Sequence, residues 1–277
     1  RDFCLSRGLG DVYKRQLRRL DMAFPLSVNL SYGQEKAETS DQRQKLGTRA
    51  STPDGRVFYY ARNGSAAITT AGMIVDAAAA FAIAAHDMDV PANANAVGTT
   101  AVSVEVPTTD LTKDQYADGY LIFNDGPGEG EVYRIKSHPK HDASDDNTVI
   151  ITIDEPDGLR TATTTSSLFG IFVNPYSAVK VIDGDGTMET GALGVTTIPM
   201  TANYYGWIQT AGIGSVAIGA AVGVVGDALQ ISQASGEDGR AELYDLSGED
   251  DLQSIGTAIG IPSVDTDKQA CMLTIRY

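Results

Sequence analysis

Two histidines three residues apart are the first side chains in this sequence that could bind a metal ion. His138 and His141 lie in the segment SHPKHDASDD, with three aspartates close behind them. A His-x-x-His spacing suits a divalent metal when both imidazoles lie on one face of a helix. Because Pro139 breaks such a helix, we interpret the segment as a solvated polar loop and expect no metal site.

Carboxylates recur elsewhere without the spacing of a catalytic or metal site. Asp183 and Asp185 in IDGDGT lack the third ligand position and the bidentate glutamate of an EF-hand. The glycine-rich GPGEGE is not followed by the helix and the Lys-Ser/Thr pair of a phosphate-binding loop. No Gly-x-Ser-x-Gly or His-Glu-x-x-His motif occurs. We therefore expect no enzyme activity and no cofactor, although a hydrolase assembled from acids far apart in the sequence remains an alternative.

Aromatic residues are the best candidates for a binding surface. Tyr204, Tyr205 and Trp207 occur together, and aromatic rings stack on sugars or pack in interfaces. Alternate residues of a strand share a face, so Tyr205 and Trp207 are expected on one face and Tyr204 on the other. A core position is the interpretation we favour for Trp207, because large aromatics anchor β cores.

The elements that must position these residues are short strands separated by turn residues. TRASTPDGRVFYYARNG and GYLIFNDGPGEGEVYRI each place two aromatic or β-branched runs around a turn rich in Gly, Asp or Pro. TTAVSVEV alternates apolar and polar residues, as a strand with one buried face does. Similar short segments continue to the C-terminus. The pattern predicts an all-β fold of antiparallel sandwich or barrel units with an extended N-terminal arm.

The domain organisation follows from changes in this pattern. We expect one β domain over residues 46–182 and a second over residues 190–277, with the segment VIDGDGTMETGALG between them. Residues 22–45 are expected to form the arm, which is either a frayed terminus or docks on a neighbouring subunit, with Leu30 and Tyr32 as its anchors. The alanine-rich stretch 77–85 suits a helix or an extended connector equally.

The first residues carry a different signal. Ser6 to Gln16 can be written in codons that resemble a transposon-based sequencing adapter read in frame. Six basic residues also cluster there, but no apolar segment of signal-peptide length follows. We expect residues 1–21 to be a translated adapter and leader, and Met22 to begin the biological chain.

Composition narrows the classes of partner. The formal net charge is −15, and without residues 1–21 the chain keeps 15 basic and 33 acidic residues, a net charge of −18. Such a balance repels phosphate backbones, so nucleic acid is not an expected partner. Cys271 is then the remaining cysteine, which excludes an intrachain disulfide. The apolar runs are shorter than a membrane span, and no membrane partner is expected.

Four stretches together resemble a known family. They are LGTRASTPDGRVFYYARNG, DQYADGYLIFNDGPGEGEVYRIKSHP, NPYSAVKV and YYGWIQTAG, and the similarity spans Leu46 to about Gly212. The chain resembles virion structural proteins of tailed bacteriophages, of the capsid-decoration or head-associated kind, often seen in environmental viral sequence. The resemblance implies a β-rich homo-oligomeric protein on the capsid surface, made in the bacterial host cytoplasm. It also implies packing positions at Tyr120, Tyr133 and Trp207. It implies turn positions at Gly55, Gly126, Gly128 and Gly130.

The expected function is therefore to bind and stabilise a phage capsid as a decoration or cement protein. Its expected partners are the major capsid protein and copies of itself. The alternative is a head-fibre or carbohydrate-binding adsorption module, which binds a surface glycan through Tyr205 and Trp207. Under either function, the candidate partner-binding residues are Leu30, Tyr32, Tyr205 and Trp207.

Overall fold

A computed structural model describes residues 28–78, 90–106, 109–183, 188–219, 225–244, 253–260 and 267–276. The expected adapter and leader, the first residues of the arm and most of the alanine-rich stretch lie outside these ranges. Throughout the described part the chain is all-β, as predicted, with one turn of 3-10 helix, η1 (Gln34–Lys36). Its strands pair antiparallel except for β1 and β2, which are parallel.

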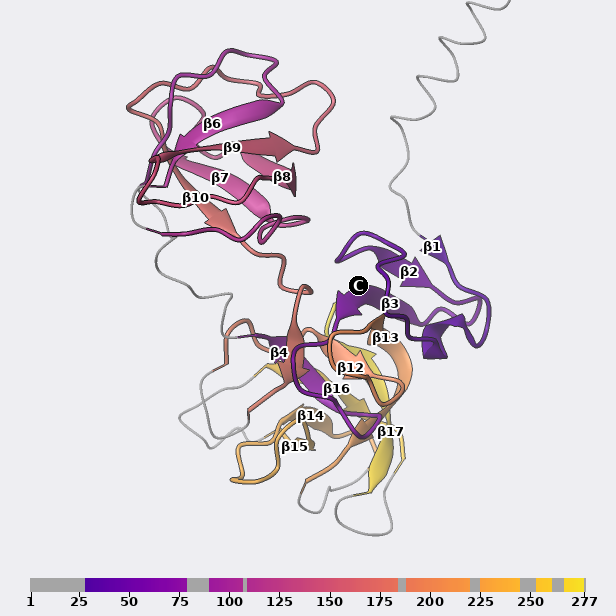
Figure 1. Ribbon diagram of the computed structural model, residues 1–277. Coiled ribbons are helices and arrows are strands. Elements are labelled where there is room, and N and C mark those ends of the chain that lie inside the picture. Colours follow the sequence, from indigo (N-terminus) through magenta and orange to yellow (C-terminus); the bar gives the residue numbers. More distant parts are fainter. Residues whose placement is uncertain are drawn as a thin grey trace, which may run out of the picture.

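The chain is organised as a body with an inserted domain (Figure 1). We call residues 28–78 and 174–276 the body, and residues 90–173 the inserted domain. The body holds an eleven-stranded sheet among the described residues, and the inserted domain a six-stranded one. The strands of the body are β1 (Val28–Asn29), β2 (Arg49–Ser51), β3 (Val57–Arg62), β4 (Ile74–Ala77), β11 (Val179–Val181), β12 (Gly194–Thr196), β13 (Tyr205–Ala217), β14 (Ala228–Ile231), β15 (Ala241–Leu243), β16 (Ser254–Ala258) and β17 (Lys268–Thr274).

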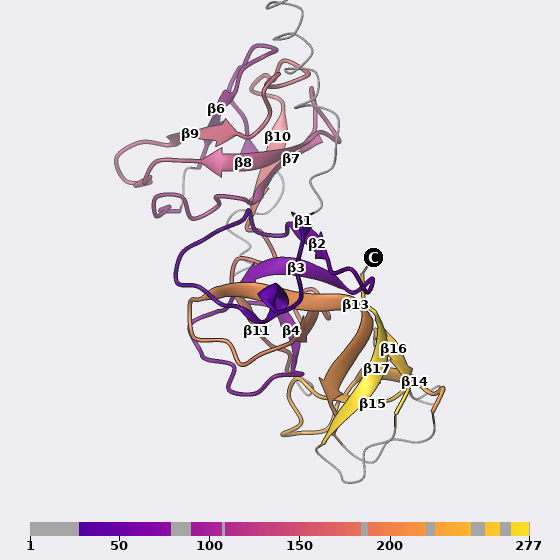
Figure 2. The same ribbon diagram turned by 90° about the vertical axis from the view of Figure 1, so that its right-hand side faces the viewer.

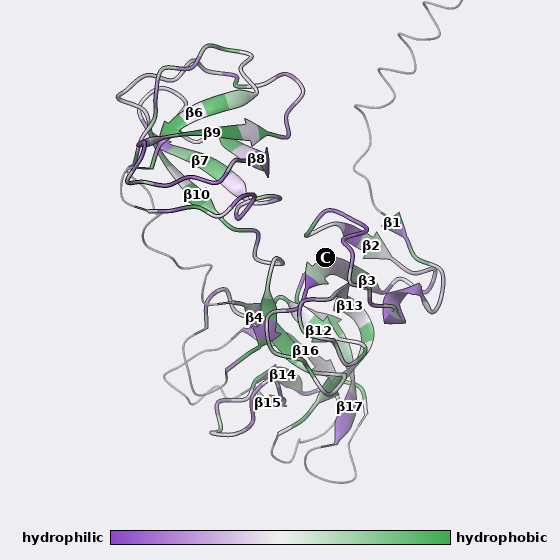
Figure 3. Cartoon of the chain, viewed as in Figure 1, coloured by the Kyte–Doolittle hydropathy of each residue, from purple (hydrophilic) through white to green (hydrophobic). Residues whose placement is uncertain are grey.

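The inserted domain is a curled sheet with its own hydrophobic core. Its strands are β5 (Val90–Pro91), β6 (Ala101–Glu105), β7 (Tyr120–Asp125), β8 (Val132–Ser137), β9 (Thr148–Ile153) and β10 (Leu168–Phe172), in the order β5-β10-β7-β8-β9-β6. An isolated bridge between Ala92 and Val104 joins the two ends of this order, so the sheet curls toward a barrel. Val102, Val104 and Val106 are buried, as the predicted alternation requires, and Figure 3 shows the apolar strands of this domain in green.

Strand β13 links the part of the body sheet that contains β3 to the part that contains β17. It pairs with β3 from Tyr205 to Ala211 and with β17 from Ala211 to Ala217. Its pairing register shifts between Gln209 and Ala211, and Gly212 follows with φ +85°. A Cβ at Gly212 would lie 3.0 Å from the Cα of Arg56, so this bend needs glycine. Figure 2 shows β13 running from the layer with β3 into the lobe with β14 to β17.

The two predicted hairpins are confirmed, but the division between the sheets differs from the predicted domains. β2 pairs with β3, and β7 with β8, as the turn residues indicate. However, β3 also pairs with β13, so strands from the two ends of the chain share one sheet. The boundary expected between residues 182 and 190 therefore does not separate the two sheets. Alternation identifies a strand from neighbouring residues, whereas the partner strand lies far away in the sequence.

Candidate functional site

The aromatic residues singled out in the sequence lie together on the body. Tyr205 stacks on Tyr60 with ring centroids 6.0 Å apart, and Trp207 meets the same ring edge-on at 5.0 Å. Both residues therefore share a face, as predicted, and Trp207 is buried with 8% exposure. The guanidinium of Arg62 lies 5.9 Å from the ring centroid of Tyr205. We call Tyr60, Tyr205 and Trp207 the aromatic cluster.

A surface depression of about 320 Å³ opens beside this cluster. Tyr60 and Trp207 line it together with residues of the N-terminal segment, including Leu30. The main-chain N–H of Arg43 donates to the Tyr60 hydroxyl at 2.9 Å. Burial raises the pKa of Tyr60, so its hydroxyl stays neutral at physiological pH. The depression offers aromatic and apolar walls for a ligand but no paired acids.

The N-terminal segment is attached to its own body rather than free to reach a neighbour. Leu30 is 5% exposed and its N–H donates to the carbonyl of Ser51 at 2.9 Å. Thr39 exchanges two main-chain hydrogen bonds with Tyr205 at 2.8 and 2.9 Å. The expectation that Leu30 anchors an arm on a partner is therefore corrected, because β1 pairs with β2 and carries Leu30 into the core. Tyr32 remains 63% exposed and available.

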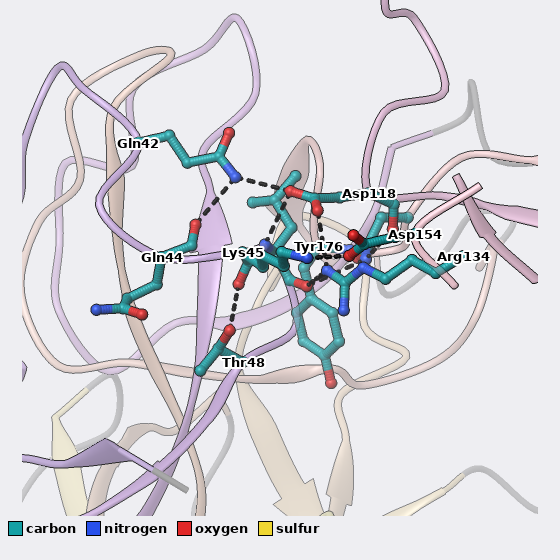
Figure 4. A network of polar contacts seen from close by, with 10 residues as sticks. Gln42, Gln44, Lys45, Thr48, Asp118, Arg134, Asp154 and Tyr176 are labelled. Carbon is teal, nitrogen blue, oxygen red and sulfur yellow. Dashed lines mark hydrogen bonds and ion pairs between the residues drawn. The ribbon is translucent and has the colours of Figure 1, made fainter. Parts of the chain in front are cut away.

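A polar network joins the inserted domain to the body (Figure 4). Arg134 of the inserted domain donates from Nη2 to the Leu46 carbonyl at 2.7 Å and forms an ion pair with Asp118 at 3.1 Å. Lys45 of the body pairs with Asp154 of the inserted domain. Asn174 donates to the carbonyl of Asp118 at 2.9 Å. We call these five residues with Leu46 the junction.

Asp118 is the central residue of the junction. Its carboxylate also accepts hydrogen bonds from the Gln42 side chain at 2.7 Å and from the Leu46 N–H at 3.3 Å. Its backbone adopts φ +62°, a left-handed conformation that costs free energy for a residue other than glycine. Its contacts with Gln42 and Leu46 therefore hold the turn that precedes β7 against the body.

The two histidines are buried, not solvated as expected. His138 is 3% and His141 5% exposed. Nε2 of His138 accepts from the N–H of Tyr116 at 3.0 Å, and Nε2 of His141 lies 2.8 Å from the Val106 carbonyl oxygen. Each ring thus satisfies a main-chain group of the inserted domain. The sequence pattern missed this because a loop that folds onto a core has no periodicity of its own.

No group of three or more His, Cys, Asp or Glu side chains converges within the described ranges as a metal site would require. The same part of the chain contains no helix with the length and apolar character needed to cross a membrane. Comparisons with protein-family models, curated proteins and solved structures found no match for this chain.

The junction and its neighbours are the residues that sequence reasoning missed. An Asp-Gly pair such as Asp118-Gly119 is typical of a turn, but nothing near it in the sequence points to Leu46 or Asn174. An Asn-Pro pair such as Asn174-Pro175 is typical of the end of a strand, whereas the Asn174 side chain bridges Leu46 and Asp118. Contacts between residues tens of positions apart leave no local pattern.

Tyr176 beside the junction provides a first test of the body's packing. Its ring stacks on Tyr59 with centroids 5.4 Å apart, and burial raises its pKa from 10.0 to about 12. Because the folded pKa lies above the unfolded value, this stabilising contribution is complete below pH 10 and is lost between pH 10 and about 12. We expect the free energy of unfolding to fall by about 3 kcal/mol across this window.

The measurement is urea unfolding at stepwise pH, followed by the fluorescence of the body. The Cys271 thiol has a pKa raised by burial to about 11, so it adds a loss of its own at alkaline pH. Both chains therefore carry Cys271→Ala, and the comparison is with Tyr176→Phe in the same background. Above pH 10 the Phe variant should lose about 3 kcal/mol less than the chain with Tyr176, because Tyr60 and Tyr133, whose pKa values burial also raises, titrate in both chains. Parallel pH profiles for the two chains would contradict the assignment.

Proposed function

We propose that this protein binds and stabilises the capsid shell of a tailed bacteriophage as a decoration or cement protein. In this proposal it is made in the host cytoplasm, resides on the virion surface, and acts without catalysis. Its partners are the major capsid protein and copies of itself. The first support is the resemblance to phage virion proteins, whose matching stretches lie on β2, β3, β7, β8, β11 and β13.

The observation that carries the proposal is the division of the chain into two β modules with separate cores. The core of the inserted domain and the two clusters of the body share no residue. Large apolar side chains are exposed on both modules, including Val132 at 54% on the inserted domain and Tyr32 at 63% on the body. In this proposal one such surface contacts a capsid subunit and the other a neighbouring copy of the chain.

The energetic role of such a protein follows from mass action. A protein that binds the assembled shell and not the dissociated subunits adds free energy at every occupied site. The acidic charge keeps the unbound protein soluble and monodisperse before assembly. Polar residues at the junction hold the two modules in one relative orientation, which lowers the entropic cost of docking both at once.

The experiment that tests this proposal is the composition of purified particles. Peptides of this chain should co-purify with virions through a density gradient in a fixed ratio to the major capsid protein. Reconstruction of the particle should place the chain on the outer shell, and particles lacking it should release DNA at a lower temperature. Absence of the chain from purified virions would overturn the proposal.

The second candidate function is carbohydrate binding by a head-fibre or adsorption module. The aromatic cluster and the depression of about 320 Å³ beside it favour this function, because sugars stack on aromatic faces. Trp207 lines the depression but is only 8% exposed, whereas Tyr205 lies outside the lining and is half-buried. Tyr205 is therefore the better contact residue, for a sugar that extends beyond the depression.

A glycan array tests this second function directly. Binding that is lost in Tyr205→Ala and retained in Tyr204→Ala supports it, because Tyr204 is the neighbouring tyrosine that forms no part of the aromatic cluster. An array without binding, or binding that both variants retain, counts against it.

A further inference from the structure

A second pocket on the body gathers positive charge on an acidic protein. Its volume is about 460 Å³, within the range of small-molecule sites. Lys36, Arg56 and Lys268 line it, although the formal net charge of the chain is −15. These cations come from η1, the β2–β3 turn and β17, so distant segments bring them together. We call this the cationic pocket.

Two carboxylates, those of Asp54 and Glu35, are engaged with Arg56. Arg56 donates from Nε to Asp54 at 2.8 Å and pairs through Nη2 with Glu35 at 3.4 Å. Glu35 is 2% exposed, and its second oxygen accepts from the N–H of Gly33 at 2.6 Å. Arg56 is thereby held in place and largely neutralised.

The two lysines are different. Both Lys36 and Lys268 are exposed, and neither forms an ion pair with any residue in the described ranges. Asp267 precedes Lys268 in the sequence but lines no part of the pocket. Two lysines without an ion-pair partner in the described ranges therefore line one cavity.

Gly72 brings Lys268 into this position. Its backbone has φ +84°, and its N–H donates to the Thr196 carbonyl at 2.7 Å. A Cβ there would lie 3.3 Å from Cε of Lys268 and 3.2 Å from the Ser215 carbonyl oxygen. The lysine stem thus lies over bare backbone, where a side chain would crowd it. The wall of the pocket is built around the lysine.

The remaining lining supplies one further donor and an apolar wall. The hydroxyls of Thr196 and Thr197 are bound to main-chain groups of Met73 and Glu35. The Ser215 hydroxyl is exposed and has no hydrogen-bond partner within the described ranges. Val195 and the 58% exposed Ile213 provide apolar surface beside it.

From this arrangement we infer that the cationic pocket binds an organic polycarboxylate, with Lys36 and Lys268 each facing a carboxylate group and Ser215 donating a third hydrogen bond. Two cations that enter from separate segments fit a ligand with more than one carboxylate. The apolar wall suits the carbon skeleton of an organic acid better than a bare inorganic anion. The ligand is either a free small acid or an acidic sugar unit of a polymer, which share this chemistry.

Calorimetric titration of the full chain at low ionic strength tests the inference, with citrate and a uronate oligomer as probes. Charge-assisted hydrogen bonds dominate such a site, so Lys36→Gln and Lys268→Gln should each weaken binding about tenfold. Both lysines are exposed, so the thermal unfolding of the variants should match that of the parent. The matched control is Lys140→Gln, an exposed lysine on the inserted domain that should leave binding unchanged.

The possible results distinguish a free acid from an acidic saccharide as the ligand, and they also show whether the inference is wrong. Citrate binding that needs both lysines supports a free acid, and uronate binding that needs both supports an acidic saccharide. The inference is overturned if neither probe binds, or if Lys140→Gln weakens binding as much as the pocket variants do. Binding of oligoglutamate alone would also overturn it and indicate an acidic peptide instead.

Discussion

Replacing Asp76 by alanine is expected to lower the free energy of unfolding of the body by about 4 kcal/mol. Asp76 is 0% exposed and lies on β4, between β11 and β12. Its carboxylate accepts four hydrogen bonds, from the N–H groups of Ala77, Glu189 and Thr190 and from the Thr190 hydroxyl, at 2.6 to 3.0 Å. Removing it leaves these donors without their acceptor around a fully buried position of β4, and each donor left unpaired costs about 1 to 3 kcal/mol.

The loss of unfolding free energy depends on both carboxylate oxygens of Asp76, because both accept hydrogen bonds. Asp76→Asn keeps the shape but places an amide NH₂ where one oxygen accepts, so it should be destabilising as well, though less than alanine. Asp267→Ala is the matched control, because Asp267 is exposed and its side chain has no partner in the described ranges. Its effect should stay below about 0.5 kcal/mol.

Urea unfolding followed by tryptophan fluorescence measures the effect on the body alone. The chain has one tryptophan, Trp207, and it lies in the core of the body. If Asp76→Ala shifts the fluorescence transition no more than Asp267→Ala does, then the carboxylate does not organise the segment from Glu189 to Thr190, and the interpretation fails.

The strands and hairpins of this protein could be predicted because their signals are local. In β17, buried and exposed residues alternate along all seven positions, which is the pattern that a period of two produces. The turns with Gly55 and with Gly126 to Gly130 adopt positive φ, as turn residues in hairpins do. Trp207 was placed in the core from its size alone.

Asp76 shows what local reasoning cannot reach. In the sequence it is the one charged residue of an apolar run, GMIVDAAAA, and nothing in that run indicates which groups it binds. Three of its four hydrogen bonds come from Glu189 and Thr190, more than a hundred residues later and after the whole inserted domain. β3 and β13 are separated even further in the sequence, and this is why the predicted boundary near residue 182 missed the insertion. Composition and period carry no information on which distant segments meet.

The inserted domain should unfold separately from the body, because the two have separate cores and meet mainly through polar contacts at the junction. We therefore expect Phe123→Ala to destabilise the inserted domain by about 3 to 5 kcal/mol and to leave the body unchanged. Phe123 is 0% exposed and its ring lies 6.2 Å from that of Tyr133 in an edge-to-face arrangement. Truncation leaves a cavity that a closely packed β core fills only partly.

Two probes distinguish the units in one experiment. Far-ultraviolet circular dichroism follows both modules, whereas Trp207 fluorescence follows the body. Phe123→Ala should split the dichroism into two transitions, the earlier one moved to lower urea, while the fluorescence midpoint stays fixed. Phe58 is an equally buried phenylalanine on β3. Phe58→Ala should therefore move the fluorescence midpoint to lower urea and leave the transition of the inserted domain in place. If both probes shift together in both variants, the junction couples the modules into one cooperative unit, and polar contacts there contribute far more than exposed ion pairs usually do.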